Sequence, residues 1–372
     1  REVLMFLQTY GATVSQCSRI VHRYGPEAIR ILKEDPYQVA REVHGIGFKT
    51  ADRLAINLGF ANDAPARLEA GVLHVLKELE GNGHTGYQPN DLEEATTTLL
   101  ETTKEGVANA IERLSSDGSL IAAESSPLLQ LPTTARAESI LAESLLLNHA
   151  QPSKLPPIKI DLAVKWAQDK AGFEFAPEQC AAVAQALASK TSILTGGPGT
   201  GKTTILRALV DILRAKKVRI VLAAPTGRAA QRMAQSARHN ASTIHRLLKF
   251  DPAGGGFVHN RDRPLNADFF IVDEASMLDN ALASSLIRAI PAQAHILFVG
   301  DADQLPSVGA GNVLGDLITS KVFPVTRLQK IFRQGAGSAV VRVAHSVLSN
   351  EAQAPYVIDE IKAQSASIQK TQ

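Results

Sequence analysis

Residues 191–204 read Thr-Ser-Ile-Leu-Thr-Gly-Gly-Pro-Gly-Thr-Gly-Lys-Thr-Thr, an apolar run that enters a glycine-rich turn. Gly-x-x-x-x-Gly-Lys-Thr is the P-loop pattern, which needs a strand before it and a helix after it. The sequence predicts both, a strand over 191–195 and a helix over 204–215. The N–H groups of such a loop and the helix N-terminus form an anion cradle. This stretch therefore predicts a nucleoside triphosphate site.

The composition is that of a globular chain without a membrane or metal signal. Its 372 residues, 45% of them hydrophobic and 20% charged, predict two or three domains. No apolar run approaches the ~20 residues of a membrane span, and no signal peptide precedes the first helix. Cys17 and Cys180 sit in no metal-type spacing. We therefore expect a cytoplasmic protein without membrane partners and, because the chain begins at Arg1, a piece of a longer one.

The net charge of +2 hides a partition along the chain. Residues 61–150 contain 14 Asp+Glu against 5 Lys+Arg, whereas residues 151–372 contain 17 against 26. Within 214–263, eleven basic residues meet two acids, Asp251 and Asp262. A local basic excess on a nucleotide-binding domain predicts a polyanion partner, and the alternative is a solvated face without a ligand.

Residues 1–60 predict short helices with one informative turn. Gly45-Ile46-Gly47 joins two of these helices and resembles the turn of the helix-hairpin-helix module. There the turn's N–H groups and the second helix's N-terminus hold a DNA phosphate without reading bases. Lys49 is close enough to assist, whereas Asp52 weakens the attraction. Gly45, Gly47 and Lys49 are thus candidate DNA contacts, and a purely structural turn is the alternative.

Residues 61–150 predict an acidic helical region that ends in a small β-wing. Helices are expected over 67–81, 92–100 and 104–116, followed by two short strands, which suggests a winged-helix-like unit. Its acidic charge would repel phosphates, so a scaffold or protein contact is favoured over DNA. Prolines mark residues 151–175 as a linker with a lead-in helix.

From residue 176 apolar runs alternate with helical stretches, which predicts a parallel sheet with helices on both faces. The strands are expected over residues 191–195, 218–223, 268–272, 294–299 and 322–326. Ligands of such sheets bind at the carboxyl ends of the strands. Residues 176–350 are therefore assigned to one nucleotide-binding α/β domain.

Polar side chains follow these strands where nucleotide chemistry needs them. Lys202 can reach β- and γ-phosphate oxygens, and the Thr203 hydroxyl can ligate Mg²⁺. Asp273 would hold Mg²⁺ through water, and Glu274 would polarise the attacking water. Two adjacent acids can equally begin a helix, but their position after a P-loop favours the catalytic interpretation.

Three further side chains complete the candidate site. Gln304 could hydrogen-bond the γ-phosphate and report its loss. Arg333 could stabilise charge on the transferring phosphoryl group. Gln179, upstream of the first strand, could pair with the adenine edge.

These motifs occur in the order of the superfamily-1 helicase motifs and most resemble the RecD-like branch. The resemblance rests on Gln179, the P-loop and the stretches 224–230, 243–245, 273–276, 300–306 and 332–334. It implies a RecA-like motor lobe over residues 176–350, with ATP and Mg²⁺ as cofactors. It also implies 5′–3′ movement on single-stranded DNA, coupled to ATP hydrolysis.

The resemblance assigns residues by the positions that they match. The catalytic set is Lys202, Asp273, Glu274, Gln304 and Arg333. The nucleotide-binding set is Gln179, Gly197, Pro198, Gly199, Thr200, Gly201, Lys202, Thr203 and Thr204, with Thr203 and Asp273 as Mg²⁺ ligands. The single-strand set is Pro225, Thr226, Arg228, Thr243 and His245. Hydroxyls and N–H groups can hold phosphates there, although a lone histidine such as His245 can equally be structural.

RecD-like helicases use two motor lobes, and no counterpart of the second follows residue 350. We expect residues 351–372 to begin the insertion between the lobes. The chain should then bind ATP or ADP but unwind a tailed duplex weakly or not at all. Two other functions stay open, a nucleotide-gated switch or loader on DNA and a non-enzymatic DNA- or protein-binding adaptor. Besides single-stranded DNA, we expect other repair or recombination proteins as partners.

Overall fold

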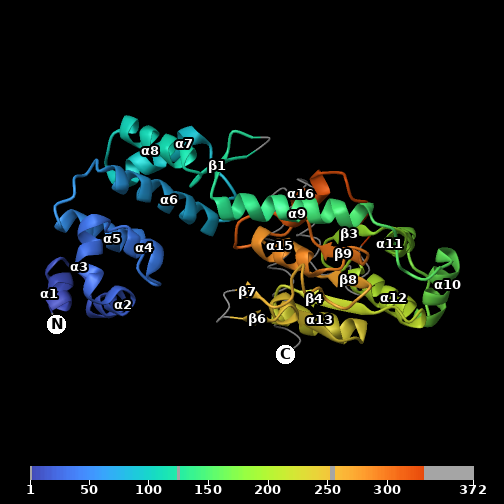
Figure 1. Ribbon diagram of the computed structural model, residues 1–372. Helices are drawn as coiled ribbons and strands as arrows, with labels where there is room; N and C mark the ends of the chain where they lie inside the picture. The colour runs from blue at the N-terminus through green and yellow to red at the C-terminus, as the bar shows by residue number, and fades with distance from the viewer. Residues whose placement is uncertain (1, 124–125, 252–255, 331–372) are drawn as a thin grey trace, which may run out of the picture. The chain divides into compact units, whose positions relative to one another are not determined.

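The computed structural model describes residues 2–123, 126–251 and 256–330 (Figure 1). Contacts divide the chain into two compact units, Arg1–Arg136 and Ala137–Gln372. Arg333 and the expected insertion over 351–372 lie outside the described residues.

The first unit is helical and ends in a small hairpin. Its elements are α1 (Glu2–Thr9), α2 (Val14–Tyr24), η1 (Gly25–Glu27), α3 (Ala28–Glu34), α4 (Gln38–Glu42), α5 (Phe48–Asn57), α6 (Pro65–Gly81), α7 (Pro89–Leu100), α8 (Lys104–Ser116), β1 (Ile121–Ala122) and β2 (Leu129–Gln130). Strands β1 and β2 pair antiparallel, as expected of a wing. The helices share one apolar core, in which Tyr37 and Leu92 are fully buried.

A buried polar network ties α5 to α6 inside that core. The Arg67 guanidinium donates to both carboxylate oxygens of Asp52, at 2.8 and 3.0 Å, and to the carbonyls of Asn62 and Leu100. The Tyr37 hydroxyl donates to Asp52 at 2.7 Å. Burial and the Asp52 carboxylate raise the pKa of Tyr37. Arg67 and Tyr37 thus bind the Asp52 carboxylate inside the protein. Its negative charge therefore opposes DNA binding at the neighbouring turn less than the sequence indicates.

Asp52→Ala should destabilise the first unit strongly, because it leaves the Arg67 guanidinium buried without its carboxylate. We expect a loss of about 3–5 kcal/mol in the free energy of unfolding, measured by urea denaturation followed by circular dichroism. Glu42→Ala is the control, since it breaks an exposed pair with Arg23 and should cost under ~1 kcal/mol. Equal losses in the two variants would contradict a structural role for the buried pair.

Helix α9 (Pro132–Ala150) changes the expected boundary between the parts. The sequence placed a domain boundary at residue 150 with a linker after it, whereas the units divide after Arg136. Leu141 and Leu145 of α9 are buried in the core of the second unit. Asn148 donates to the carbonyls of Ala292 and Ala294, which anchors the helix end. Most of α9 thus belongs to the second unit, and the irregular segment begins after residue 150.

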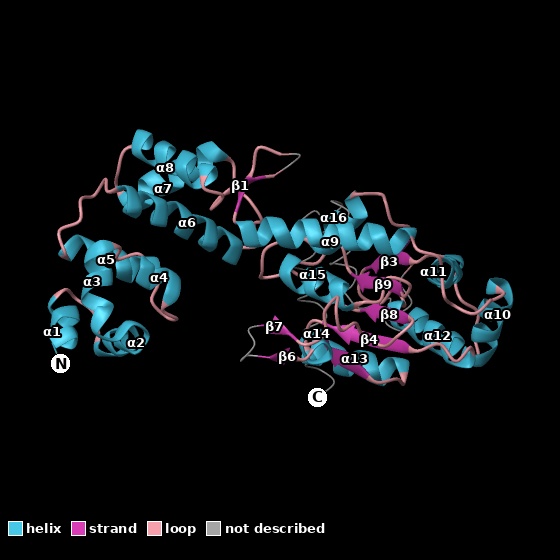
Figure 2. Ribbon diagram, in the orientation of Figure 1, coloured by secondary structure: helices cyan, strands magenta, loops and turns pink. Residues whose placement is uncertain are grey.

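The second unit is built on a six-stranded sheet, drawn in magenta in Figure 2. Its strands are β3 (Thr191–Gly196), β4 (Ile220–Ala224), β5 (Ala241–Thr243), β8 (Phe269–Val272), β9 (His295–Gly300) and β10 (Val325–Leu328). Their order is β10-β3-β9-β8-β4-β5, and every pair is parallel. The remaining elements are α10 (Ile160–Ala171), α11 (Pro177–Ala188), α12 (Lys202–Ala215), α13 (Gly227–Ala237), α14 (Ile244–Leu248), β6 (Phe250–Asp251), β7 (Gly256–Phe257), η2 (Ala275–Met277), α15 (Asn280–Ala289) and α16 (Val313–Thr319).

Helices cover both faces of this sheet because its strands are apolar on both sides. Ile193, Phe270 and Phe298 point into a core shared with α9, α15 and α16. Leu194 and Ile271 point into the opposite core, shared with α10, α11, α12 and α13. Side chains that alternate between two buried faces are the mark of a parallel sheet enclosed by helices. The predicted fold class is confirmed.

Strand β5 is the member of this sheet that the sequence missed. It has three residues, none of them fully buried, so the sequence contains no apolar run at this position that would predict a strand. The other strands of the sheet lie within three residues of their expected bounds. Across the part of the chain that the structure describes, no helix combines the length and the apolar character that crossing a membrane requires.

Candidate nucleotide site and nucleic-acid interface

The P-loop curls between the end of β3 and the start of α12. Strand β3 is buried along its whole length, which fixes where the loop begins. Gly199 and Gly201 have φ of +84° and +91°, a left-handed conformation that side-chain-bearing residues rarely adopt. Thr200 closes the loop through a 2.8 Å hydrogen bond from its hydroxyl to the Gly197 carbonyl. Helix α12 then starts at Lys202 with its N-terminus facing the loop.

Lys202 lies over the loop that precedes it. Its ammonium donates to the carbonyl of Gly196 and, at 3.0 Å, to that of Gly197. These neutral partners leave its positive charge in place at the mouth of the loop. Thr203, the next residue, is exposed on the first turn of α12. The positions suit a cradle for phosphates with a hydroxyl at its edge.

Asp273 and Glu274 follow β8, two strands away from β3 in the same sheet. The Asp273 N–H donates to Ala223 at 2.9 Å, and its carboxylate accepts from the Glu274 N–H at 2.9 Å. Burial, with a smaller contribution from Glu274, raises the pKa of Asp273 to about 6. The charge of Lys202 opposes that shift, which places the carboxylate within electrostatic reach of the P-loop lysine.

Gln304 belongs to the loop after β9, the strand between β3 and β8. The Ala302 N–H donates to the Thr195 hydroxyl at 3.1 Å and so fastens this loop to the P-loop strand. The Gln304 side chain is exposed, and its amide donates to Asp301 at 3.4 Å. The loop therefore presents Gln304 at the same edge of the sheet as Lys202 and Asp273.

The structure does not test the remaining two nucleotide candidates, Gln179 and Arg333. Gln179 is buried, and its side-chain oxygen accepts from the Ala176 N–H at 3.0 Å, which caps α11. Its contact with adenine stays a prediction, beside this structural role. Arg333 lies outside the described residues, so its place is also still a prediction.

Asp273→Asn should stabilise the folded chain in the absence of nucleotide. A carboxyl whose pKa is raised to about 6 ionises less readily when folded than when unfolded. The folded state is therefore favoured most below pH ~4, and this contribution is lost as the pH rises through about 6. The substitution should raise the free energy of unfolding by roughly 2–3 kcal/mol above pH 6.

Urea denaturation at several pH values tests this expectation, with Asp262→Asn as the matched control. Asp262 is exposed, so the same chemical change there should leave stability nearly unchanged. The gain from Asp273→Asn should shrink toward zero below pH ~4. A gain that does not vary with pH would mean that ionisation of Asp273 is not its cause.

The predicted contacts to single-stranded DNA follow β4 and β5, at the end of the strand order away from β10. They lie at the same edge of the sheet as the nucleotide candidates. Strands β4 and β5 are neighbours, and Ala224 pairs in register with Thr243. Thr226 and Thr243 cap α13 and α14, each hydroxyl accepting an N–H at 3.2 Å. Arg228 is exposed on the first turn of α13. The structure thus brings the two predicted stretches together, with part of each hydroxyl's bonding capacity used for capping.

An aromatic cluster beside His245 escaped the sequence analysis. Phe250 and Phe257 face each other across the β6–β7 hairpin, with ring centroids 5.4 Å apart. The exposed His245 ring packs at 6.5 and 5.7 Å from these two rings. Phe250 is 54% exposed. The signal was present as two phenylalanines flanking the glycine run 254–256, but the sequence alone does not show that they meet His245.

The turn between α4 and α5 forms in the first unit. Arg19 donates to the carbonyls of His44 and Gly45, at 3.4 and 3.1 Å, which holds the turn from behind. Gly47 precedes α5 without a side-chain cap, so the first N–H groups of the helix stay available. Lys49 is exposed, 3.7 Å from Glu78. Whether this turn contacts DNA stays a prediction.

Family models match residues in both units of the chain. Residues 179–310 match a family model described as an AAA domain, and residues 1–86 match that of the ATP-dependent RecD2 DNA helicase HHH domain. The ATP-dependent RecD2 DNA helicase of Deinococcus radiodurans is 37% identical over 367 residues, covering 95% of this chain and 50% of that protein. The chain thus spans about half the length of this relative.

Two further matches each cover less than half of the chain. The RecBCD enzyme subunit RecD of Mycolicibacterium smegmatis is 40% identical over 172 residues, covering 40% of this chain and 30% of that protein. The solved structure of the Pif1 helicase from Candida albicans has 26% identity and a TM-score of 0.36, covering 46% of this chain and 43% of that one.

Proposed function

We propose, because the chain belongs to the RecD-like family of DNA helicases, that it supplies the ATP-hydrolysing and strand-gripping part of a 5′–3′ helicase. One observation carries the proposal. The nucleotide candidates after β3, β8 and β9 share a sheet edge with the strand-binding candidates after β4 and β5. A single rigid sheet therefore links phosphate chemistry to a polyanion track.

The P-loop would hold the phosphates of ATP through the N–H groups of Gly197 and residues 199–201 and the charge of Lys202. Thr203 and Asp273 supply the hard oxygen ligands that Mg²⁺ prefers, so the residues fit the ion. Bound there, Mg²⁺ would neutralise charge on the phosphates as the terminal bond breaks. Glu274 would orient the attacking water, and Gln304 would contact the γ-phosphate.

Single-stranded DNA would lie over the ends of β4 and β5. The exposed Arg228 would meet its phosphates, and Pro225, Thr226 and Thr243 would line the track. Bases stack on aromatic faces without regard to sequence, which suits a protein that moves along a strand. The cluster of His245, Phe250 and Phe257, which lies within the basic stretch 214–263, would offer such faces.

In the first unit, the α4–α5 turn would hold a further phosphate without reading sequence. The available N–H groups after Gly47, the turn at Gly45 and the exposed Lys49 would supply the contact. The neutralised Asp52 supports this role, whereas the proximity of Glu78 to Lys49 weakens it. Contacts with other repair or recombination proteins are a further expectation of the family.

Lys202→Ala should abolish nucleotide binding by the chain and any ATP turnover that single-stranded DNA stimulates. Removing the side chain that brings a cation from the P-loop to the phosphates should lower turnover about a hundredfold or more. Calorimetry with Mg²⁺-ADP gives the affinity, and phosphate release with and without DNA gives the turnover. Lys165→Ala, which removes an exposed lysine of α10 outside the stretch 214–263, is the control and should change neither. Normal nucleotide affinity in Lys202→Ala would contradict the site.

Phe250→Ala should weaken binding of a single-stranded oligonucleotide, because a base loses its stacking partner. A loss of about 1–3 kcal/mol corresponds to roughly fivefold to 150-fold in Kd, measured by fluorescence anisotropy. Phe173→Ala is a closely matched control, since Phe173 is 53% exposed but lies between α10 and α11. Equal weakening in both variants would assign the effect to general destabilisation and remove the cluster from the track.

A further inference from the structure

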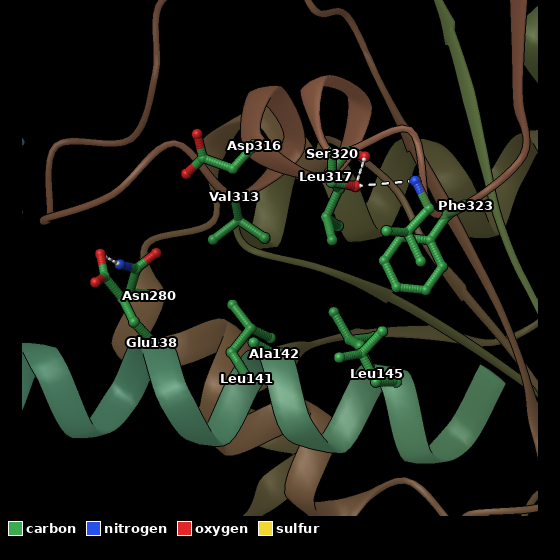
Figure 3. Close-up of a pocket in the computed structure, with 12 residues that line it drawn as sticks. Glu138, Leu141, Ala142, Leu145, Asn280, Val313, Asp316, Leu317, Ser320 and Phe323 are labelled. Atoms are coloured by element: carbon green, nitrogen blue, oxygen red, sulfur yellow. Dashed lines mark hydrogen bonds between the residues drawn. The ribbon is translucent and has the colours of Figure 1, made fainter. Parts of the chain in front are cut away.

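A cavity of about 330 Å³ opens between helices α9 and α16 of the second unit (Figure 3). Its walls are apolar and come from both helices and from the segment after α16. They are formed chiefly by Leu141, Leu145, Val313, Leu317 and Phe323. The volume is that of a small organic ligand, and none of the catalytic or strand-binding candidates lines it.

One end of the cavity is acidic. Glu138 of α9 and Asp316 of α16 lie at that end, on opposite walls, as Figure 3 shows. Asn280 lies beside them and donates its amide to Glu138 at 2.9 Å. Burial, together with the neighbouring Glu138 carboxylate, raises the pKa of Asp316. Two carboxylates that repel each other at the end of an apolar cavity favour a cation between them.

The rim carries apolar side chains that water contacts. Leu146 is 51% exposed and Val322 46% exposed, and both line the cavity mouth. A ligand that covered them would remove apolar surface from water, which is favourable at about 25 cal/mol per Å². The mouth therefore suits an apolar body, and the acidic end suits a charged head.

We propose that this cavity binds a small organic cation, with its apolar body between α9 and α16 and its ammonium group at Glu138 and Asp316. The ammonium would donate hydrogen bonds to the two carboxylates. An anion of the same shape would meet two like charges and be rejected.

Occupancy of the cavity should be felt at the nucleotide site, a part of the inference that rests on the proposed function. The Asn280 N–H donates to the Ala310 carbonyl at 2.9 Å, in the loop that carries Gln304. Leu314 of α16 packs against Gly300, so closely that a Cβ there would lie 2.6 Å from its methyl group. A ligand wedged against α16 and Asn280 thus pushes on both ends of that loop.

The first test compares three probes of one shape by calorimetry on the full chain. These are 4-phenylbutylamine, 4-phenylbutan-1-ol and 4-phenylbutanoate. The amine should bind at least tenfold more tightly than the carboxylate, with the alcohol between them, because charge-assisted hydrogen bonds favour only the cation. Equal binding of all three probes would overturn the proposal.

Two variants then locate the binding. Glu138→Gln combined with Asp316→Asn keeps the shape of the acidic end and should lower amine affinity about tenfold while leaving the alcohol unchanged. Ala142→Leu adds bulk at an exposed position on the cavity wall and should weaken both probes without disturbing the core. Unchanged amine affinity in both variants would place the binding elsewhere and overturn the site.

Coupling is measured as the affinity for Mg²⁺-ADP with and without saturating amine. A change of twofold or more, absent in the double variant, is expected. An unchanged ADP affinity would overturn the coupling. Because probe binding is measured without nucleotide, failure of the nucleotide site itself would show as lost ADP binding and would leave the probe result intact.

Discussion

The close approach of strands β3 and β9 to the elements beside their ends sets the geometry of the whole nucleotide edge. Strands β3 and β9 end in Gly196 and Gly300. A Cβ on Gly196 would lie 2.8 Å from the Leu328 carbonyl, and one on Gly300 would lie 2.6 Å from Leu314. A side chain at either position would push β10 or α16 away from the sheet. The P-loop, the Gln304 loop and α16 therefore keep their places because these two strand ends carry no side chain.

The sequence was sufficient where one local pattern determines the result. The P-loop, the doubly buried strands and the acids after β8 each follow from residues that are neighbours in the chain. It failed where the decisive contacts are distant. Leu145, Leu146 and Leu147 follow one another in α9 and so lie on different sides of the helix. The helix therefore has no single apolar face from which one could predict that Leu141 and Leu145 pack in the core of the second unit. The packing of His245 against Phe250 and Phe257 could not be predicted either, because it depends on how the β6–β7 hairpin folds back toward α14.

Capping explains why several predicted ligand contacts cannot be read from residue type alone. Gln179, Thr226 and Thr243 each use a side-chain oxygen to bond a helix N-terminus. A hydroxyl has a donor and two acceptor lone pairs, so a threonine can cap a helix and still donate to a phosphate. Gln179 is buried and has less freedom to serve two partners. Structural and functional roles are therefore compatible at the threonines and compete at the glutamine.

The two acids after β8, Asp273 and Glu274, each adopt a state that is unfavourable for the residue itself. Glu274 has φ of +53°, a left-handed conformation that costs a non-glycine residue of order 1 kcal/mol or more. Asp273 is ionised against burial and against Glu274. Neither feature helps the chain to fold, and each persists because the strand ends around it are fixed. The Glu274 N–H donates to the Asp273 carboxylate at 2.9 Å, a hydrogen bond that favours the ionised form of Asp273. This bond offsets only part of the cost of burying the carboxylate, because the pKa of Asp273 is still raised to about 6. The cost that remains belongs to the ionised side chain, so a neutral residue at 273 would relieve it while the backbone strain at Glu274 would stay.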